Sequence, residues 1–198
     1  MDADTREAMD RRIQLATPED MVSGLFCENA YLAIREMLGR DVADSVRAAT
    51  WPLRPWASFQ RYPVGELLRM MDTAADLAEK QGVLSYPQAL EEIGGWVTRI
   101  TQGTPFSRAA HLAVGNDPHE RLAMSQASAR VLVTYGERKY EREGPTHSRL
   151  IWKRELMGPS FLLGAYAVIA QSIPGVTITV TLGPCLEPGM NFQLHCSW

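Results

Sequence analysis

Hydrophobic positions recur at helical spacing through the first two thirds of the chain. Met21, Leu25, Leu32 and Met37 share one face, and the helix that carries them is predicted to begin at Thr17-Pro18 and to end at Gly39. The same reasoning predicts further helices at about 41–49, 63–80, from Ser85, from Thr104-Pro105, and from Asp117-Pro118 to about Tyr135.

One of these predicted helices contains a glycine pair. Gly94-Gly95 interrupts the helix that follows Ser85, at a cost of about 1 kcal/mol per glycine relative to alanine. The pair indicates either a close approach by another segment or a break in the helix.

The pattern changes after Gly136 to the alternation that is typical of strands. Residues 138–143 and 149–155 flank a Gly144-Pro145 turn and predict a hairpin, and a helix is predicted from Pro159 to about Gln171. Two more strands are predicted at 175–182 and 191–198. The fold class is therefore α+β: five or six helices, then a four-stranded antiparallel sheet in the order β-β-α-β-β.

The length of 198 residues fits one domain. Residues 1–16 are polar and rich in Asp and Arg, so we expect a polar tail there and a single domain over 17–198. At this size folding hides roughly 70% of the unfolded chain's surface, which is sufficient for a core without disulfides or metal.

Charge argues against several classes of partner. Twenty Lys and Arg against 23 Asp and Glu give a net charge of −3, with the two signs interleaved, so we expect no nucleic-acid partner. The first residues are charged rather than apolar, and the longest apolar run, 161–170, is about half of the ~20 residues that a membrane span needs. We expect a cytoplasmic protein with reduced cysteines and no membrane insertion.

The candidate metal ligands are Cys185 and Cys196, with His195 beside them. An antiparallel pairing of the last strands could bring the two cysteines together, but neighbours on a strand point to opposite faces, so His195 and Cys196 cannot both join them. Because no C-x-x-C spacing is present, we interpret the cysteines as small buried apolar residues. We expect no metal and no other cofactor.

The other titratable residues also favour structural roles. His111 and His119 lie on predicted helices and are expected to be exposed, and Glu141, Glu143 and Glu155 alternate with basic residues as on the solvated face of a hairpin. The sequence shows no phosphate-binding glycine loop and no nucleophile motif, so an enzyme is not predicted.

The order of these motifs resembles a known superfamily. Residues 21–26, 62–63, 67–75, 89–90 and 93–94 are similar to the opening and middle helices shared by haem-nitric-oxide-binding (H-NOX) domains, 4-vinyl-reductase-type ligand domains and small subunits of vesicle-tethering complexes. Residues 135–141 and 155–161, with Gly164 and the closing Trp198, resemble an uncharacterised family of roughly 200-residue proteins with many paralogues in myxobacteria.

The resemblance implies a ligand site, but one without haem. H-NOX domains ligate iron through a histidine late in the helix before the hairpin and hold the propionates with a Tyr-x-Ser-x-Arg motif. Here that helix has no histidine after His119, its later stretch reads Gln126-Ala127-Ser128-Ala129-Arg130, and the motif does not occur. The zinc cysteines of some 4-vinyl-reductase-type domains are represented by Cys185 and Cys196 alone.

Three functions from different classes remain open. The first is a non-enzymatic sensory or regulatory module that binds a small apolar ligand between helices and sheet. The second is a dimeric interaction module that resembles tethering-complex subunits and partners a Ras-like GTPase. An enzyme acting on a tetrapyrrole-like ring is a third. The candidate ligand-binding residues, which are equally compatible with a plain core, are Leu67, Met71, Trp96, Leu132, Tyr135, Trp152 and Phe161.

Overall fold

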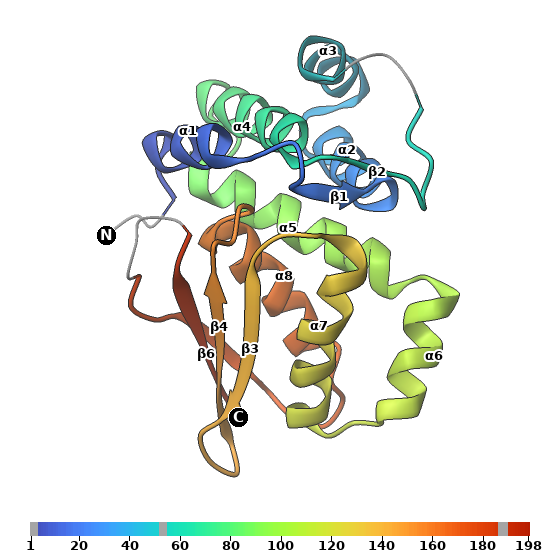
Figure 1. Ribbon diagram of the computed structural model, residues 1–198, viewed down its shortest axis with the longest axis vertical. Helices are drawn as coiled ribbons and strands as arrows, with labels where there is room; N and C mark the ends of the chain where they lie inside the picture. The colour runs from blue at the N-terminus through green and yellow to red at the C-terminus, as the bar shows by residue number, and fades with distance from the viewer. Residues whose placement is uncertain (1–3, 52–54, 186–189) are drawn as a thin grey trace.

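Two helices that cross at the centre of the molecule, α5 (Tyr86–Gln102) and α8 (Pro159–Gln171), separate a helical part from a sheet. The computed structural model describes residues 4–51, 55–185 and 190–198. In Figure 1 the N-terminal helices lie on one side of α5 and the sheet on the other. The mixed α+β class expected from the sequence is confirmed.

The described residues form eight helices, one more than the helices that the sequence pattern predicts. Besides α5 and α8 they are α1 (Arg6–Leu15), α2 (Gly24–Leu38), α3 (Arg40–Thr50), α4 (Val64–Lys80), α6 (Pro105–Val114) and α7 (Pro118–Leu132). A small two-stranded sheet, β1 (Met21–Ser23) with β2 (Arg61–Pro63), joins the starts of α2 and α4.

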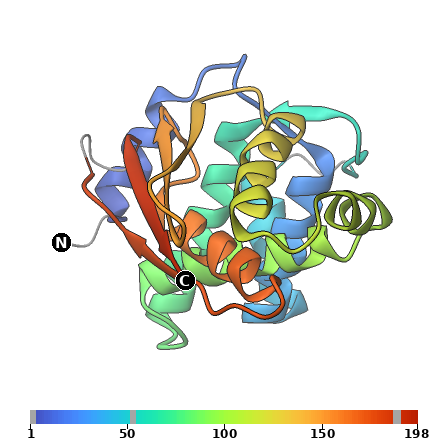
Figure 2. The same cartoon turned by 90° about the horizontal axis from the view of Figure 1, so that it is seen from below.

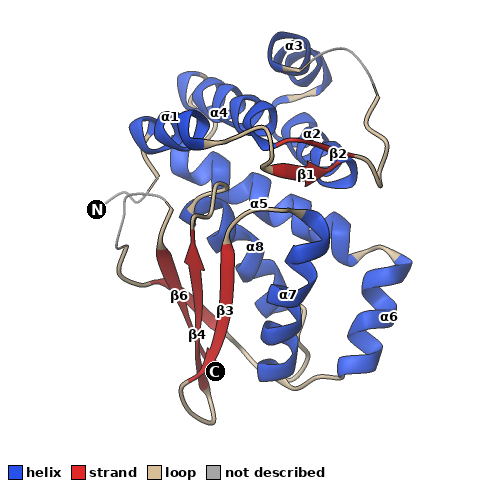
Figure 3. Ribbon diagram, viewed as in Figure 1, coloured by secondary structure: helices blue, strands red, loops and turns tan. Residues whose placement is uncertain are grey.

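The main sheet is antiparallel throughout (Figure 3). Its strands are β3 (Glu137–Arg142), β4 (His147–Lys153), β5 (Thr179–Leu182) and β6 (Phe192–Ser197), in the spatial order β3-β4-β6-β5. Buried and accessible residues alternate along β4 and β6, as expected of a sheet with one covered face. Figure 2 shows α7 and α8 on the same side of this sheet.

Two features near the N-terminus differ from the sequence prediction. Residues 6–15, expected to belong to a polar tail, form α1, which packs against α4 with Met9 and Arg12 fully buried. The helix predicted from Thr17 begins instead at Gly24, with Ser23 as its N-cap, because Val22 pairs with Tyr62 in the small sheet. Thr17 and Pro18, which predicted the helix start, lie in a turn instead. There the backbone N–H of Thr17 donates to the Asp20 carboxylate at 2.7 Å.

A buried charge pair connects the N-terminal segment to α8. Arg12 Nη2 lies 2.5 Å from the Asp4 carboxylate, and both side chains are fully buried. The second Asp4 oxygen accepts a hydrogen bond from the backbone N–H of Ser160, in the first turn of α8, at 2.7 Å. A carboxylate at this position satisfies a helix-end donor and is favoured by the helix dipole.

The glycines of the α5–α8 crossing allow backbone-to-backbone contact. A Cβ built on Gly94 would lie 2.0 Å from the carbonyl oxygen of Phe161, and one on Gly164 would lie 1.8 Å from the carbonyl oxygen of Glu91. At Gly95 the nearest atom would be 3.5 Å away, an ordinary contact. Of the two interpretations that the sequence allowed, a close approach of another segment or a break in the helix, the structure shows the close approach.

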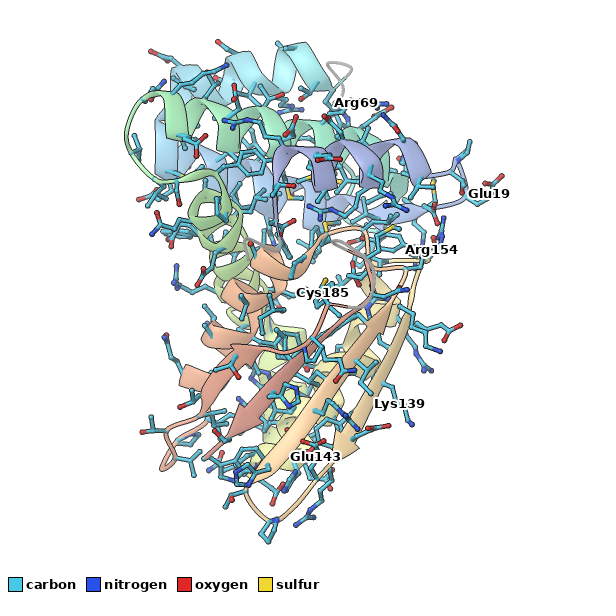
Figure 4. All side chains as sticks on the ribbon, turned by 90° about the vertical axis from the view of Figure 1, so that its left-hand side faces the viewer. Glu19, Arg69, Lys139, Glu143, Arg154 and Cys185 are labelled. Atoms are coloured by element: carbon cyan, nitrogen blue, oxygen red, sulfur yellow. The ribbon has the colours of Figure 1, made fainter. Side chains whose placement is uncertain are left out.

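A second ion pair fixes the turn after β4 to the N-terminal segment, near Glu19 and Arg154 in Figure 4. Arg154 donates both terminal nitrogens to the two Asp20 oxygens, each at 2.7 Å. Hydrogen bonds from Arg154 lower the pKa of Asp20, against the opposing effect of burial, and Thr17 adds to the lowering.

No helix in the described part of the chain combines the length and the apolar character needed to cross a bilayer.

Substituting Gly94 should separate the two central helices. We expect Gly94→Ala to lower the free energy of unfolding by about 3 kcal/mol or more, because neither partner of a backbone clash is a flexible side chain. Gly95→Ala is the matched control: it has room for the methyl group and should be neutral or stabilise by up to about 1 kcal/mol. Urea unfolding measures both. Equal stability of the two variants would contradict the close approach.

Removing the Asp20 charge should destabilise the protein in a pH-dependent way. A carboxylate whose pKa is lowered in the folded state contributes stability above its ordinary value of 3.8, and that contribution is lost as pH falls through the folded value. We expect Asp20→Asn to cost about 1–2 kcal/mol at pH 7 and progressively less below about pH 3.8. Urea unfolding at pH 7, 5 and 3 measures the difference. Glu137→Gln, at the exposed Lys153 pair, should change stability by less than about 0.5 kcal/mol at each pH.

Candidate functional site

A cavity of about 870 Å³ lies between α5, α8, α6, α7 and the end of the sheet where β3 begins and β4 ends. Its volume falls within the range of about 300–1,000 Å³ that is typical of small-molecule sites. The side chains around it are predominantly apolar, with a few polar groups.

Several regions of the chain build the wall. The start of α2 and the loop before β2 contribute Phe26 and Phe59, α5 contributes Val97 and Thr101, and α6 contributes Ala110 and His111. From α7 come Arg121, Met124, Ser125, Ser128, Ala129 and Leu132, and from α8 come Phe161, Leu162, Ala165, Tyr166 and Ile169. Tyr135, Arg138, Trp152, Glu155 and Met157 close the end nearest the hairpin.

The first turn of α7 is anchored to the hairpin by His119. Its ring hydrogen-bonds to the Tyr140 hydroxyl and, at 2.9 Å, to the carbonyl oxygen of Pro145, and it packs edge-on against Trp198 at 4.6 Å between centroids. The expectation of an exposed His119 is therefore wrong: the residue is 6% exposed, because the hairpin turn folds over it.

His111 and Arg121 lie in the same part of the wall. Burial, together with the positive charge of Arg121, lowers the pKa of His111, so the imidazole is neutral near pH 7. Arg121 donates to the hydroxyl of Ser172, after α8, at 3.2 Å. His111 is half-buried rather than exposed as predicted, because its helix packs alongside α7.

The hairpin end of the wall contains a buried ion pair. Arg138 pairs with Glu155, and the two side chains are 6% and 2% exposed. The prediction that Glu155 lies on the solvated face of the hairpin is therefore wrong: Glu155 follows β4, and its buried carboxylate accepts from Arg138 and from the N–H of Met157. For Glu141 the prediction is confirmed: it pairs with Arg149 at 2.6 Å and with Lys139, which projects outward in Figure 4.

Four of the seven residues proposed from the sequence lie in the cavity wall: Leu132, Tyr135, Trp152 and Phe161. Leu132 ends α7, Tyr135 precedes β3, Trp152 is on β4 and Phe161 is in the first turn of α8. The chain thus brings together residues that are up to 29 positions apart in sequence, 161 against 132, at one end of the cavity.

The other three lie outside the wall. Leu67 and Met71 are fully buried on α4, which packs on the side of α5 away from the sheet. Trp96 is partly buried on α5, with the guanidinium carbon of Arg99 4.9 Å from its ring centroid. Their positions follow from the α5–α8 crossing, which puts α5 between α4 and the cavity.

The two cysteines proposed as weak metal candidates lie in different environments. Cys196 is buried beneath the sheet, where desolvation raises the pKa of its thiol to about 12, whereas Cys185 is exposed beyond β5. Among the described residues, no group of three or more His, Cys, Asp or Glu side chains is placed to hold a metal ion.

Sequence reasoning missed several wall residues, notably His111, Met124, Arg138 and Glu155. Their burial depends on where α6 and α7 pack, which no local pattern encodes. One signal was available: Glu155 is followed directly by apolar Leu156 and Met157, a composition that favours a chain turning inward at the end of a strand.

The fold is similar to that of solved H-NOX proteins. An H-NOX protein from K. algicida in the Fe(II) unliganded state matches with a TM-score of 0.70 at 16% identity, over 88% of this chain and 95% of that chain. An S. oneidensis H-NOX variant matches with a TM-score of 0.66 at 12% identity, over 88% and 95%. An oxygen-binding H-NOX domain related to soluble guanylate cyclases gives 0.64 at 12%, over 88% and 94%. At these identities the likeness shows the fold alone.

Comparison with curated proteins gives no significant match. A family model described as "Protein of unknown function (DUF2378)" matches residues 15–182, from the end of α1 to the end of β5. Because that match spans most of the chain, the protein belongs to the DUF2378 family, which has an H-NOX-like fold.

Proposed function

We propose that the protein is a non-enzymatic sensory or regulatory module that binds a small apolar ligand in the cavity between its helices and its sheet. The observation that carries this proposal is the cavity itself, with a volume of about 870 Å³ and a predominantly apolar wall. One of the structural neighbours is described as an oxygen-binding H-NOX domain, which supports a ligand-binding use of the same fold.

Two exposed apolar side chains support access to the cavity from outside. Phe59 and Val131 are both exposed, and both line the cavity. Exposed apolar side chains that gather at one place mark ligand-binding grooves, whereas singly scattered ones are normal on protein surfaces. We assign these residues to the mouth through which an apolar ligand enters.

The alternative, a dimeric module that partners a Ras-like GTPase, is less well supported. A protein whose only role is to present a surface gains stability by filling its core, since each missing contact in a void is a loss of packing energy. A cavity of this size instead favours a ligand-binding function.

We further propose that the ligand is not haem, because the donor set of the cavity wall fits haem poorly. Haem needs an axial ligand to iron and cations for its two propionates. In the described wall the one imidazole is His111, on α6, while α7 presents Arg121, methionine, serines and alanine. Arg138 is already paired with Glu155, whose carboxylate would lie beside a propionate bound there.

We also propose that the protein is not an enzyme, and the pairing of charged groups in the wall supports this. General acid-base chemistry needs a titratable group that is available to the bound molecule. Glu155 accepts from Arg138 and from the N–H of Met157, and Arg121 donates to Ser172. These groups serve structure rather than proton transfer.

Native mass spectrometry of the purified protein, with an absorption spectrum of the same sample, tests the proposal. We expect a bound small molecule released on denaturation and no Soret band. A Soret band in the wild-type protein that disappears in His111→Ala would overturn the haem-free proposal. A protein that neither retains a molecule nor binds an added apolar probe would contradict ligand binding and would favour the interaction module.

Filling the cavity should abolish binding of an apolar probe. We expect Ala129→Trp, in the wall on α7, to weaken binding of the neutral fluorophore N-phenyl-1-naphthylamine at least about tenfold, because the indole occupies probe volume. The matched control is Ala127→Trp, at an exposed position on the same helix outside the wall, which should bind like the wild type. Fluorescence titration measures both. Similar loss in both variants would mean that the probe binds elsewhere.

A further inference from the structure

One buried hydroxyl group in the cavity wall has no partner. Tyr135 is 3% exposed, and its hydroxyl oxygen makes no hydrogen bond within the described part of the chain. Most buried hydroxyl groups in proteins are hydrogen-bonded, because an unsatisfied one loses its interaction with water without replacement. Among the described residues, the Tyr135 hydroxyl is one of several buried polar atoms without a hydrogen bond, and it belongs to a residue in the wall of the proposed ligand cavity.

The two charged residues next to Tyr135, Arg138 and Glu155, are paired with one another. Arg138 donates one nitrogen to the backbone carbonyl oxygen of Tyr135 at 2.7 Å and another to Glu155, and its guanidinium carbon lies 5.6 Å from the Tyr135 ring centroid. Glu155 also accepts from the N–H of Met157 at 3.1 Å. Arg138 therefore holds the backbone of Tyr135, while the Tyr135 hydroxyl is buried without a hydrogen bond.

The second buried tyrosine of the wall shows the contrast. The hydroxyl of Tyr166, on α8, is hydrogen-bonded to the hydroxyl of Ser125, on α7, at 2.9 Å. Both phenols line the cavity and both are almost fully buried, but only the Tyr166 hydroxyl is satisfied by the protein.

The charge around Tyr135 selects against an ionic ligand. Arg138 and Glu155 neutralise one another, so a charged ligand group at this end of the cavity would be buried without a counter-charge, which is costly. Burial raises the pKa of Tyr135 well above its ordinary value of 10, so the hydroxyl keeps the proton that a donor needs.

We propose that Tyr135 is a ligand-binding residue that donates a hydrogen bond to an uncharged carbonyl oxygen on an otherwise apolar ligand. The inference rests on the proposed function and names its ligand class: a neutral, predominantly hydrocarbon molecule with a ketone-type oxygen at one end. The apolar body lies against Phe26, Met157 and Phe161, which share a core cluster with Tyr135 and line the cavity.

A matched pair of ring compounds tests this inference. Fluorenone and fluorene have the same rigid outline and differ in the carbonyl group, so the ratio of their affinities isolates the contribution of the oxygen. Each is titrated as a competitor of N-phenyl-1-naphthylamine against the wild type, Tyr135→Phe and Tyr166→Phe. We expect Tyr135→Phe to weaken fluorenone about 3- to 10-fold and to change fluorene by less than twofold, as for loss of one net hydrogen bond.

Tyr166→Phe is the control for loss of a phenol hydroxyl in the same wall. It should leave the ratio of fluorenone to fluorene affinity as in the wild type, because its hydroxyl is used by Ser125. Infrared spectroscopy gives an independent readout: the carbonyl stretch of bound fluorenone should be shifted to lower frequency in the wild type and in Tyr166→Phe, and should rise in Tyr135→Phe.

The outcomes separate the inference from the proposed function. If the naphthylamine probe binds but Tyr135→Phe leaves the affinity ratio and the carbonyl stretch unchanged, the role of Tyr135 is refuted and ligand binding stands. If neither the probe nor the ring compounds bind, the proposed function itself fails. Should Tyr135→Phe not fold, the wild-type carbonyl stretch decides: a frequency equal to that of fluorenone in hydrocarbon solvent rejects the hydrogen bond.

Discussion

The contact on which this architecture depends is the backbone-to-backbone approach of α5 and α8. At Gly94 and Gly164 the two helices lie so close that there is no room for a methyl group between them. Glycine is unfavourable inside a helix, but only glycine allows this distance. Because α8 is held so close to α5, the helical part and the sheet share one central layer. The wall of the cavity is then built from residues of α5 and α8 that point away from the crossing, toward α6 and α7.

The cavity combines a well-anchored frame with a loosely filled interior. The ends of α7 are positioned by polar contacts, His119 to the hairpin at its start and the β1 region after its end, where Thr134 donates to the carbonyl oxygen of Glu19. Since these contacts fix α7 from outside, its inner face does not need to pack against α8 along its whole length. A fold can keep an open volume only when the surrounding elements are held by something other than the contents of that volume.

Local chemistry explains how far the sequence could predict this structure. The starts of α6 and α7 follow from Thr104-Pro105 and Asp117-Pro118, in which one residue supplies the cap and the next fixes the backbone. The hairpin follows from alternation around Gly144-Pro145. In contrast, the sequence does not predict α1, because its buried face includes Arg12. Arg12 is buried through its pair with Asp4, and from composition alone both residues are expected at the surface. Tyr135 and Glu155 illustrate the same limit: which side of a strand end faces a cavity is decided by distant helices.

The contact between Asp4 and Ser160 also has a consequence for how the chain assembles during synthesis. Asp4 leaves the ribosome well before Ser160, whose backbone N–H donates to it from 156 residues further along the chain. Until that segment emerges, the Asp4–Arg12 pair has no cover from α8, and α1 lacks one of its attachments. Completion of the N-terminal helix layer is therefore coupled to the last third of the chain, a long-range closure of the kind that slows folding.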